Sequence, residues 1–231
     1  MLLLRRAMDD LKGRTVSLGA LVERALDESL AALFARDAER AVKVVQADRE
    51  IDRLEVEIEE ECLKVLALHQ PVAADLRFVA AILKLTNDLE RIGDLAVDLS
   101  QRAASLAWQP PIAFVPTLSE MADPVKSMVR RSLDSLVELD SELAREVLIA
   151  DDEIDELHRR AFQEVTDRLR EQPEHVDAHI QMLSTSRYLE RIADHATNIA
   201  EDVIYFLEGQ IVRHETRRRT TEGSGVERPV E

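Results

Sequence analysis

Apolar residues recur along most of this chain at the three- and four-residue spacing of amphipathic α-helices. The first stripe includes Leu18, Val22, Leu26 and Leu33. It is followed by Asp37, a residue type that commonly caps the helix after it. After the helix that carries this stripe, the spacing predicts five more helices, at residues 38–69, 73–106, 117–139, 141–171 and 175–210.

Two kinds of break separate the predicted helices. Gln70-Pro71 and Gln172-Pro173 each end a helix, because proline removes a backbone hydrogen bond and clashes with the preceding turn. The segment from Trp108 to Pro116 contains three prolines and predicts a stiff linker. In the helix predicted at 38–69, one apolar set is expected to face the core: Val42, Val45, Ile51, Leu54, Ile58, Leu63 and Leu66.

The pattern after the linker repeats the pattern before it. Three pairs of segments match: Ala47–Asp52 with Ala150–Asp155, Gln70-Pro71 with Gln172-Pro173, and Leu89–Asp94 with Leu189–Asp194. A long internal repeat indicates a repeated structural unit, and each unit here holds three predicted helices. We therefore expect an all-α protein of two tandem antiparallel three-helix bundles related by a pseudo-twofold axis. The expected divisions are a first bundle at 1–107, a proline-rich linker at 108–116, a second bundle at 117–212 and a disordered tail at 213–231.

Composition agrees with long helices around an aliphatic core. Of the 231 residues, 45% are hydrophobic but only 3% are aromatic, and only 6 are glycine. The single cysteine, Cys62, excludes an intramolecular disulfide and fits a reducing compartment. The longest apolar run, Phe78–Leu83, is far shorter than the roughly 20 residues of a membrane-spanning helix. Together these features predict a cytoplasmic protein.

The formal net charge of -16 narrows the range of partners. Nucleic-acid binding needs a basic surface, so it is not expected. Anionic lipid would repel the protein as a whole, so contact with a membrane is expected only through protein partners. An acidic surface suits cations and basic protein surfaces, although a merely solvated acidic face has the same composition.

Two of the predicted helices carry carboxylates at four-residue spacing. This spacing places successive side chains about one turn apart, roughly 6 Å along the axis, so that they share one slowly rotating face. Like charges at this distance repel, and hard cations, which take several oxygen ligands, would offset the repulsion. The predicted metal ligands are Glu90, Asp94 and Asp98 on one helix, Glu190, Asp194, Asn198 and Asp202 on the other, and Asp48, Asp52, Asp151 and Asp155 on facing helices.

A solvated structural face is the alternative interpretation of these ladders. The chain contains 46 acidic residues, so a single carboxylate ladder arises easily by chance. Arg91 and Arg191 are also placed to neutralise neighbouring acids in ordinary surface pairs. The metal interpretation is favoured by recurrence, since the same ladder with the same flanking Leu-Glu-Arg-Ile appears in both repeats.

The same residues resemble the PhoU family from about residue 14 to residue 210. The segment Glu190–Glu201 is especially similar to the second motif of that family. The resemblance implies that the two ladders stand at the family's metal positions, where some members hold iron or zinc and others use magnesium, manganese or no metal. Asn198 stands in place of a third acid, which lowers the charge of the second site.

The resemblance also implies a function. It implies a negative regulator of phosphate uptake and of phosphate-starvation signalling, acting as a homodimeric adaptor. The expected partners are the ATPase subunit of a phosphate ABC transporter and a sensor histidine kinase.

An enzyme is not expected, for reasons that come from the residues themselves. The chain has no glycine-rich phosphate loop and no Ser/His/Asp or Cys/His set. The Glu-x-x-His elements of ferritin-like oxidoreductases do not follow the ladders. A metal-storage or metal-sensing helical protein remains the alternative to the adaptor.

Overall fold

The computed structural model describes residues 2–210 and is helical almost throughout. Its six α-helices are α1 (Leu2–Ala35), α2 (Ala38–His69), α3 (Ala73–Ala107), α4 (Pro116–Glu138), α5 (Ser141–Glu171) and α6 (Val176–Glu208), with a short 3-10 helix at Pro173–His175. No strand occurs among the described residues. The tail predicted at 213–231, and the last two residues of the predicted second bundle, lie outside them.

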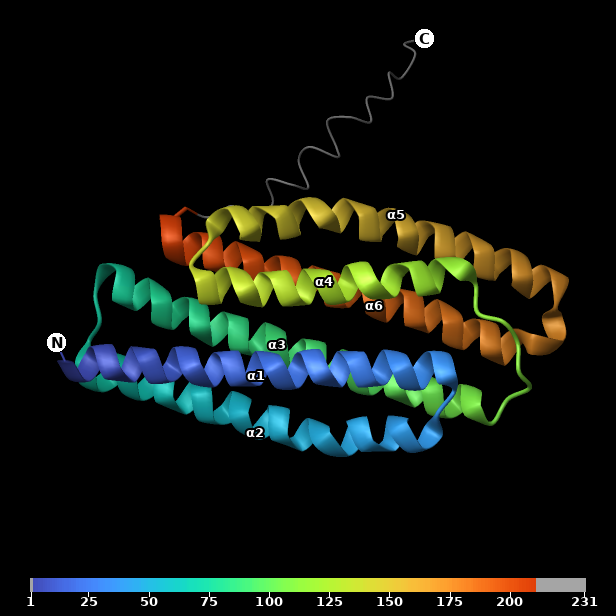
Figure 1. Ribbon diagram of the computed structural model, residues 1–231, viewed down its shortest axis with the longest axis horizontal. Coiled ribbons are helices and arrows are strands. Elements are labelled where there is room, and N and C mark those ends of the chain that lie inside the picture. The colour runs from blue at the N-terminus through green and yellow to red at the C-terminus, as the bar shows by residue number, and fades with distance from the viewer. Residues whose placement is uncertain (1, 211–231) are drawn as a thin grey trace, which may run out of the picture.

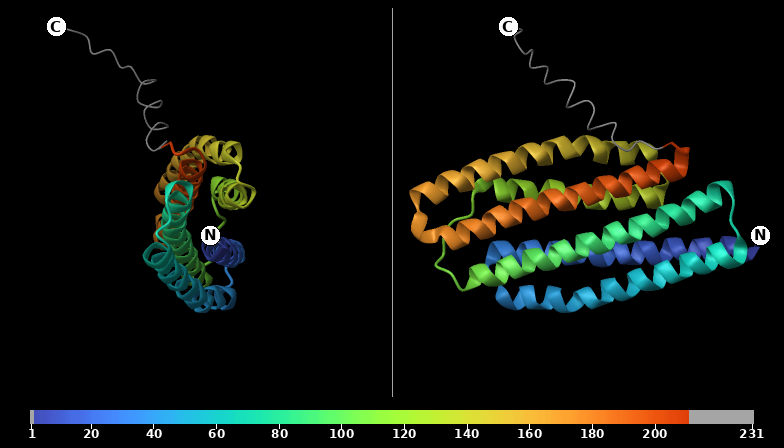
Figure 2. Two further views of the ribbon diagram at one scale, coloured as in Figure 1. Left: turned by 90° about the vertical axis from the view of Figure 1, so that its left-hand side faces the viewer. Right: turned by 180° about the vertical axis from the view of Figure 1, so that it is seen from behind.

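The helices form two antiparallel three-helix bundles, α1–α3 and α4–α6 (Figure 1). Helices α2, α3, α6 and α5 lie side by side in that order as one layer, and α1 and α4 cover one face of this layer (Figure 2). The predicted all-α fold of two tandem three-helix bundles is thereby confirmed. No helix of the described chain is long and apolar enough to cross a membrane.

In each bundle, the first helix is joined to the second by the same kind of turn. Asp37 caps α2 and Asp140 caps α5, each accepting a hydrogen bond from the backbone N–H three residues later. The residue before each cap, Arg36 or Leu139, has a left-handed backbone with φ of 53° or 57°. This conformation reverses the chain within two residues, so that consecutive helices pack antiparallel.

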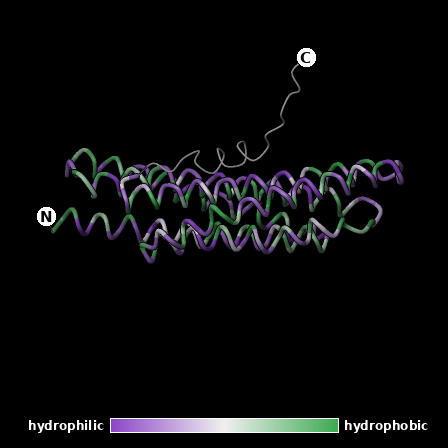
Figure 3. The backbone as a smooth tube through the Cα atoms, turned by 90° about the horizontal axis from the view of Figure 1, so that it is seen from above, coloured by the Kyte–Doolittle hydropathy of each residue, from purple (hydrophilic) through white to green (hydrophobic). Residues whose placement is uncertain are grey.

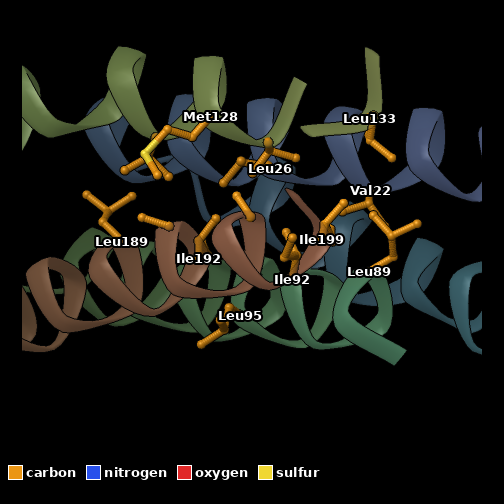
Figure 4. Packing of buried hydrophobic residues seen from close by; sticks show 14 of the residues in the cluster. Val22, Leu26, Leu89, Ile92, Leu95, Met128, Leu133, Leu189, Ile192 and Ile199 are labelled. Carbon is orange, nitrogen blue, oxygen red and sulfur yellow. The ribbon is translucent and has the colours of Figure 1, made fainter. Parts of the chain in front are cut away.

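The core fills the space between the four-helix layer and the helices α1 and α4 that cover it. Every helix alternates hydrophobic and hydrophilic residues along its length (Figure 3). Figure 4 shows Val22 and Leu26 of α1 and Met128 of α4 in the space that they share with Ile192 and Ile199 of α6. All of these side chains are buried within one continuous cluster. The core therefore belongs to both bundles and joins them.

Helices α1 and α4 approach closely at Gly19. A Cβ atom added there would lie 2.8 Å from Cδ2 of Leu133 on α4. Such a distance is shorter than ordinary van der Waals contact, so the absence of a side chain at Gly19 lets the two bundles close against each other.

One expectation about α2 was wrong. Val42, Val45 and Leu63 are exposed to 50%, 40% and 53%, although the spacing placed them in the core. Helix α2 lies at the edge of its layer and packs mainly against α1 and α3. A narrow seam therefore suffices, and its buried members recur every seven residues: Val44, Ile51, Ile58 and Val65.

Candidate functional site

Acidic residues occupy helix-packing positions on α2. A second series at the seven-residue interval runs beside the buried seam of α2: Ala41, Asp48, Glu55 and Cys62. The two outer members are buried, whereas the two acids between them are half-buried. The matching series on α5 is Ala144, Asp151, His158 and Val165. Polar groups thus interrupt the apolar contact between the outer helices and their neighbours in both bundles.

Gly93 allows α2 to lie especially close to α3. A Cβ atom at this position would be 3.2 Å from Cγ2 of Ile51 and 3.4 Å from Oδ1 of Asp48. The carboxylate of Asp48 is therefore held directly against α3, at the level of the first ladder. The second repeat has Ala193 at the corresponding place.

The first acidic cluster consists of five side chains from α2 and α3: Asp48, Asp52, Glu55, Glu90 and Asp94. Burial, followed by the negative charges of Asp52 and Asp94, raises the pKa of Asp48 to about 6. Burial is also the main cause of the raised pKa of Glu90, and the charge of Asp94 comes next. The cluster therefore holds negative charge at an energetic cost that a proton or a cation would relieve.

Arg91 neutralises part of the first acidic cluster. Its guanidinium lies 3.3 Å from Glu90 Oε2 and 3.1 Å from Asp94 Oδ2. Because the Arg91 and Asp94 side chains are about half exposed, these pairs contribute little to stability. Arg91 therefore forms the surface ion pairs that are expected of a solvated acidic face. A solvated face does not account for Asp48, whose pKa is raised by burial and by acids alone.

The second acidic cluster repeats the first on α5 and α6 with one change. Its members are Asp151, Asp155, His158, Glu190 and Asp194. Burial, followed by the charges of Asp155 and Asp194, raises the pKa of Asp151 to about 7. His158 stands where the first cluster has a glutamate, and its Nδ1 lies 2.7 Å from Oγ of Ser186. The second cluster therefore combines oxygen and nitrogen donors.

The second ladder does not remain on one face. A step of four residues turns about 40° beyond a full helical turn, so three steps carry a side chain about a third of the way around the axis. Asn198 and Asp202 therefore face α3 of the other bundle. Nδ2 of Asn198 donates to Asp88 at 3.2 Å, and Nζ of Lys84 donates to Asp202 at 3.1 Å. Asn198 and Asp202 nevertheless line the same groove as Asp194 of this ladder. On the first ladder, Asp98 follows Asp94 by one turn and is half-buried.

A groove of about 980 Å³ lies between the bundles and connects the two acidic clusters. Glu55 from the first cluster and Asp151 and Asp194 from the second line it, together with residues of the α3–α6 contact. Within that contact, Nδ1 of His195 lies 2.8 Å from Oδ1 of Asp88, which is only 8% exposed. The four-helix layer thus presents two acidic clusters and a polar groove on its outer face.

The contact between Asp88 and His195 was not anticipated from the sequence. The first repeat has Leu95 where the second has His195, and the second has Tyr188 where the first has Asp88. A comparison of the two repeats position by position would have marked both residues as polar departures. Their pairing, however, depends on how α3 crosses α6.

The donor types of both clusters fit a cation. Carboxylates suit magnesium, manganese and iron, and a cluster that includes imidazole also suits zinc. In the described part of the chain, no three His, Cys, Asp or Glu side chains already converge closely enough to hold a metal ion. Binding would therefore require side-chain rotation, which half-buried residues on helix surfaces permit.

Both bundles match one family model. The PhoU domain model matches residues 15–103 and again residues 118–203, which include both acidic clusters. The chain belongs to the PhoU family. The remaining comparisons agree with this assignment.

Curated PhoU relatives are similar over nearly the whole chain. A homologue from Pseudomonas putida is 36% identical over 216 residues, which cover 93% of this chain and 84% of the relative. One from Aquifex aeolicus is 38% identical over 210 residues, covering 91% and 95%. Both are named phosphate-specific transport system accessory protein PhoU homologues.

Solved PhoU structures share the fold. PhoU from Pseudomonas aeruginosa superposes with a TM-score of 0.86 at 34% identity, covering 89% of this chain and 99% of that one. The regulatory protein PhoU from Streptococcus pneumoniae gives 0.84 at 28% identity, covering 90% and 99%. The comparisons therefore establish the family and the fold together.

Replacing Asp48 and Asp151 together with asparagine should stabilise the protein at pH 8. Both pKa values are raised in the fold, to about 6 and about 7. The stabilisation from protonated carboxyls is complete below their ordinary pKa of about 4 and is lost as pH rises through 6 to 7. The double variant should gain about 2 kcal/mol at pH 8, a figure discounted for solvent screening. Urea unfolding at pH 5 and pH 8 measures this gain.

Glu153→Gln is the matched control, because Glu153 is exposed on α5 beside the second cluster. It should leave the difference between pH 5 and pH 8 unchanged. If the double variant showed the same pH dependence as the parent, the electrostatic cost attributed to these two carboxylates would be absent.

Proposed function

We propose that this PhoU-family protein is a non-enzymatic adaptor that restrains phosphate import and phosphate-starvation transcription when phosphate is plentiful. The observation that carries the proposal is the match of the family model across both bundles, including both acidic clusters. The names of the relatives support it, because they describe accessory proteins of phosphate-specific transport. In this proposal the protein works in the cytoplasm as a homodimer.

The proposed partners are the ATPase subunit of a phosphate ABC transporter and a sensor histidine kinase. The outer face of the layer formed by α2, α3, α6 and α5 suits this role. It presents two acidic clusters and the polar groove over four long helices, and its charge complements basic protein surfaces. A partner that binds there would change the free-energy cost of holding these carboxylates ionised and close together. Its affinity would therefore differ between the protonated, metal-bound and metal-free forms of the clusters.

We further propose that each acidic cluster binds a divalent or ferric cation. Asp48, Asp52, Glu90 and Asp94 would supply oxygen ligands in the first bundle. Their counterparts in the second bundle are Asp151, Asp155, Glu190 and Asp194, with His158 beside them. The bound cation would offset the repulsion that raises the pKa values of Asp48 and Asp151.

The double variant Asp94→Ala, Asp194→Ala should lose bound metal and keep its helix content. These side chains lie at the outer edge of each seam and contribute repulsion more than packing, so their removal should not unfold the bundles. Elemental analysis after loading with iron, zinc, manganese or magnesium, together with circular dichroism, tests this. The control is Glu153→Ala, an exposed acid whose loss should leave metal content unchanged. A parent that retains no metal after any loading defeats the metal proposal.

Deletion of the gene should release both phosphate uptake and phosphate-starvation transcription in cells supplied with phosphate. The intact gene should restore restraint, and the Asp94→Ala, Asp194→Ala gene should restore it less well, because its product folds but presents altered clusters. Uptake of labelled phosphate and a starvation-gene reporter measure the two outputs. Pull-down of the transporter ATPase and the kinase with each protein then locates the defect.

The adaptor proposal fails if deletion leaves both outputs unchanged and no second PhoU-family gene compensates. A phenotype that follows metal supply and ignores phosphate supply would instead indicate metal storage or sensing.

A further inference from the structure

The outer face of α2 carries a second seven-residue pattern. Alternating steps of four and three residues place eight side chains on the side of the helix opposite the buried seam. We call this set the outer seam; its members are Val42, Gln46, Arg49, Arg53, Val56, Glu60, Leu63 and Ala67. All of them are exposed, and the two valines and the leucine are exposed to 50%, 50% and 53%. Because α2 forms one edge of the molecule (Figure 1), the outer seam faces away from the rest of the described chain.

Helix α5 forms the opposite edge and provides an internal comparison (Figure 1). The offset that relates Asp48 to Asp151 gives the positions on α5 that correspond to the outer seam: Arg145, Ile149, Asp152, Glu156, Arg159, Gln163, Thr166 and Arg170. Ile149 is the only apolar residue among them. The repeated bundle plan therefore does not require apolar residues at this edge. Their recurrence on α2 at multiples of seven residues indicates a contact that α2 alone makes.

The charges that flank the outer seam are largely paired along α2 itself. Nζ of Lys43 lies 3.1 Å from Glu39, Nη1 of Arg53 lies 2.7 Å from Glu57, and Nζ of Lys64 lies 3.3 Å from Glu61. Other acids of α2 point to neighbouring helices. Asp52 and Glu59 lie toward α3, where their charges act on Glu55 of the first acidic cluster, and Glu50 lines a pocket toward α1.

Two charged members of the outer seam remain. Arg49 and Glu60 are exposed, and neither forms an ion pair with another described residue. With Arg53, the outer seam has two basic members and one acidic member, so it adds no net negative charge in a chain of net charge -16. Arg49 and Glu60 are therefore available to pair with another chain.

A second copy of α2 that runs antiparallel complements the outer seam. In one register Arg49 faces Glu60 of the partner subunit, and twofold symmetry then makes Glu60 face Arg49 of the partner subunit. The same register sets Val42 opposite Ala67 of the partner subunit and Leu63 opposite Gln46 of the partner subunit. Val56 lies opposite Arg53 of the partner subunit, whose aliphatic stem can cover an apolar side chain.

The other arrangements of two α2 helices are less favourable. Sliding one helix by seven residues sets Arg49 either against Arg53 of the partner subunit or against Ala67 of the partner subunit. A parallel pair in register sets Arg49 against Arg49 of the partner subunit and Glu60 against Glu60 of the partner subunit. Because like charges in contact are unfavourable, the charges of the outer seam select the antiparallel register.

We propose that the outer seam is the contact between two copies of this chain, formed by an antiparallel pair of α2 helices around a twofold axis. The contact joins the four-helix layers of the two copies edge to edge. It uses no residue of either acidic cluster. This inference rests on the homodimer of the proposed function and identifies its interface.

Reversal of the two charges tests the contact. Arg49→Glu sets the new glutamate against Glu60 of the partner subunit twice in each dimer, and Glu60→Arg sets two pairs of arginines together. Each variant alone should therefore raise the dimer dissociation constant at least about tenfold. An equal mixture of the two variants should form heterodimers with an affinity close to that of the parent, because both contacts then pair a glutamate with an arginine. Analytical ultracentrifugation of the full chain over a range of concentrations measures these constants.

Arg159→Glu is the matched control. It makes the same change of charge at an exposed position of α5 that corresponds to Val56, and it should leave the dissociation constant unchanged. Circular dichroism should show equal helix content in all of these proteins.

Cysteine cross-linking tests the register. Cys62, the only cysteine, is buried, and Cys62→Ala removes it from the experiment. In that background, Val42→Cys protein should form a disulfide-linked dimer with Ala67→Cys protein. Neither should cross-link to itself, because each cysteine would lie about 38 Å along the helix axis from its counterpart in the partner.

Three results would overturn the proposal: a parent that stays monomeric, an Arg49→Glu or Glu60→Arg variant with the dissociation constant of the parent, or Val42→Cys protein that cross-links to itself. A monomeric parent would also remove the homodimer from the proposed function. The other two results would reject this interface and leave the homodimer in place. None of the three bears on the deletion phenotype, so the interface and the adaptor function fail separately.

Discussion

In both bundles, carboxylates occupy helix-packing positions on the outer helix. On α2 and α5, one of the two seven-residue series is apolar throughout, and the other carries Asp48 or Asp151 at its centre. An apolar residue at either place would extend the seam and stabilise the bundle. The acid instead weakens the seam and keeps a region of high negative potential on the outer face. The apolar residues of these seams, such as Ile51 and Ile154, belong to the continuous core that α1 and α4 share, and this core stabilises each bundle despite the acid.

This division explains why α3 and α6 occupy the centre of the layer. Each has one face in the shared core, one edge against an outer helix, and one edge against the other central helix. The carboxylate ladders of α3 and α6 follow the edge toward the outer helices, where Asp94 and Asp194 join the clusters. Further along α6 the ladder turns toward α3, so that Asp202 meets Lys84 across the boundary between the bundles. The groove at this boundary therefore brings the two acidic clusters into one surface.

Much of the fold was predictable because its determinants are local. Helical spacing and proline breaks predicted where the six helices lie. Asp37 and Asp140 cap helices, as their positions suggested. The burial of side chains on α2 was predicted less well, because the spacing of apolar residues does not show how much of a helix's surface its neighbours cover. The site shows the same limit. The two acidic clusters could be expected from the four-residue spacing of carboxylates on one helix and from the acids on the helix that faces it. The pairing of His195 with Asp88 could not, because it depends on how two helices distant in sequence cross.

The fold holds Asp48 and Asp151 in positions where ionisation is unfavourable. Side-chain carboxyl carbon NMR of the intact protein, titrated from pH 3 to pH 9 without added metal, tests it residue by residue. We expect a titration midpoint of about 6 for Asp48 and of about 7 for Asp151, because each pKa is raised by burial and by neighbouring acids. Midpoints of about 4 for both, the ordinary value for aspartate, would contradict it.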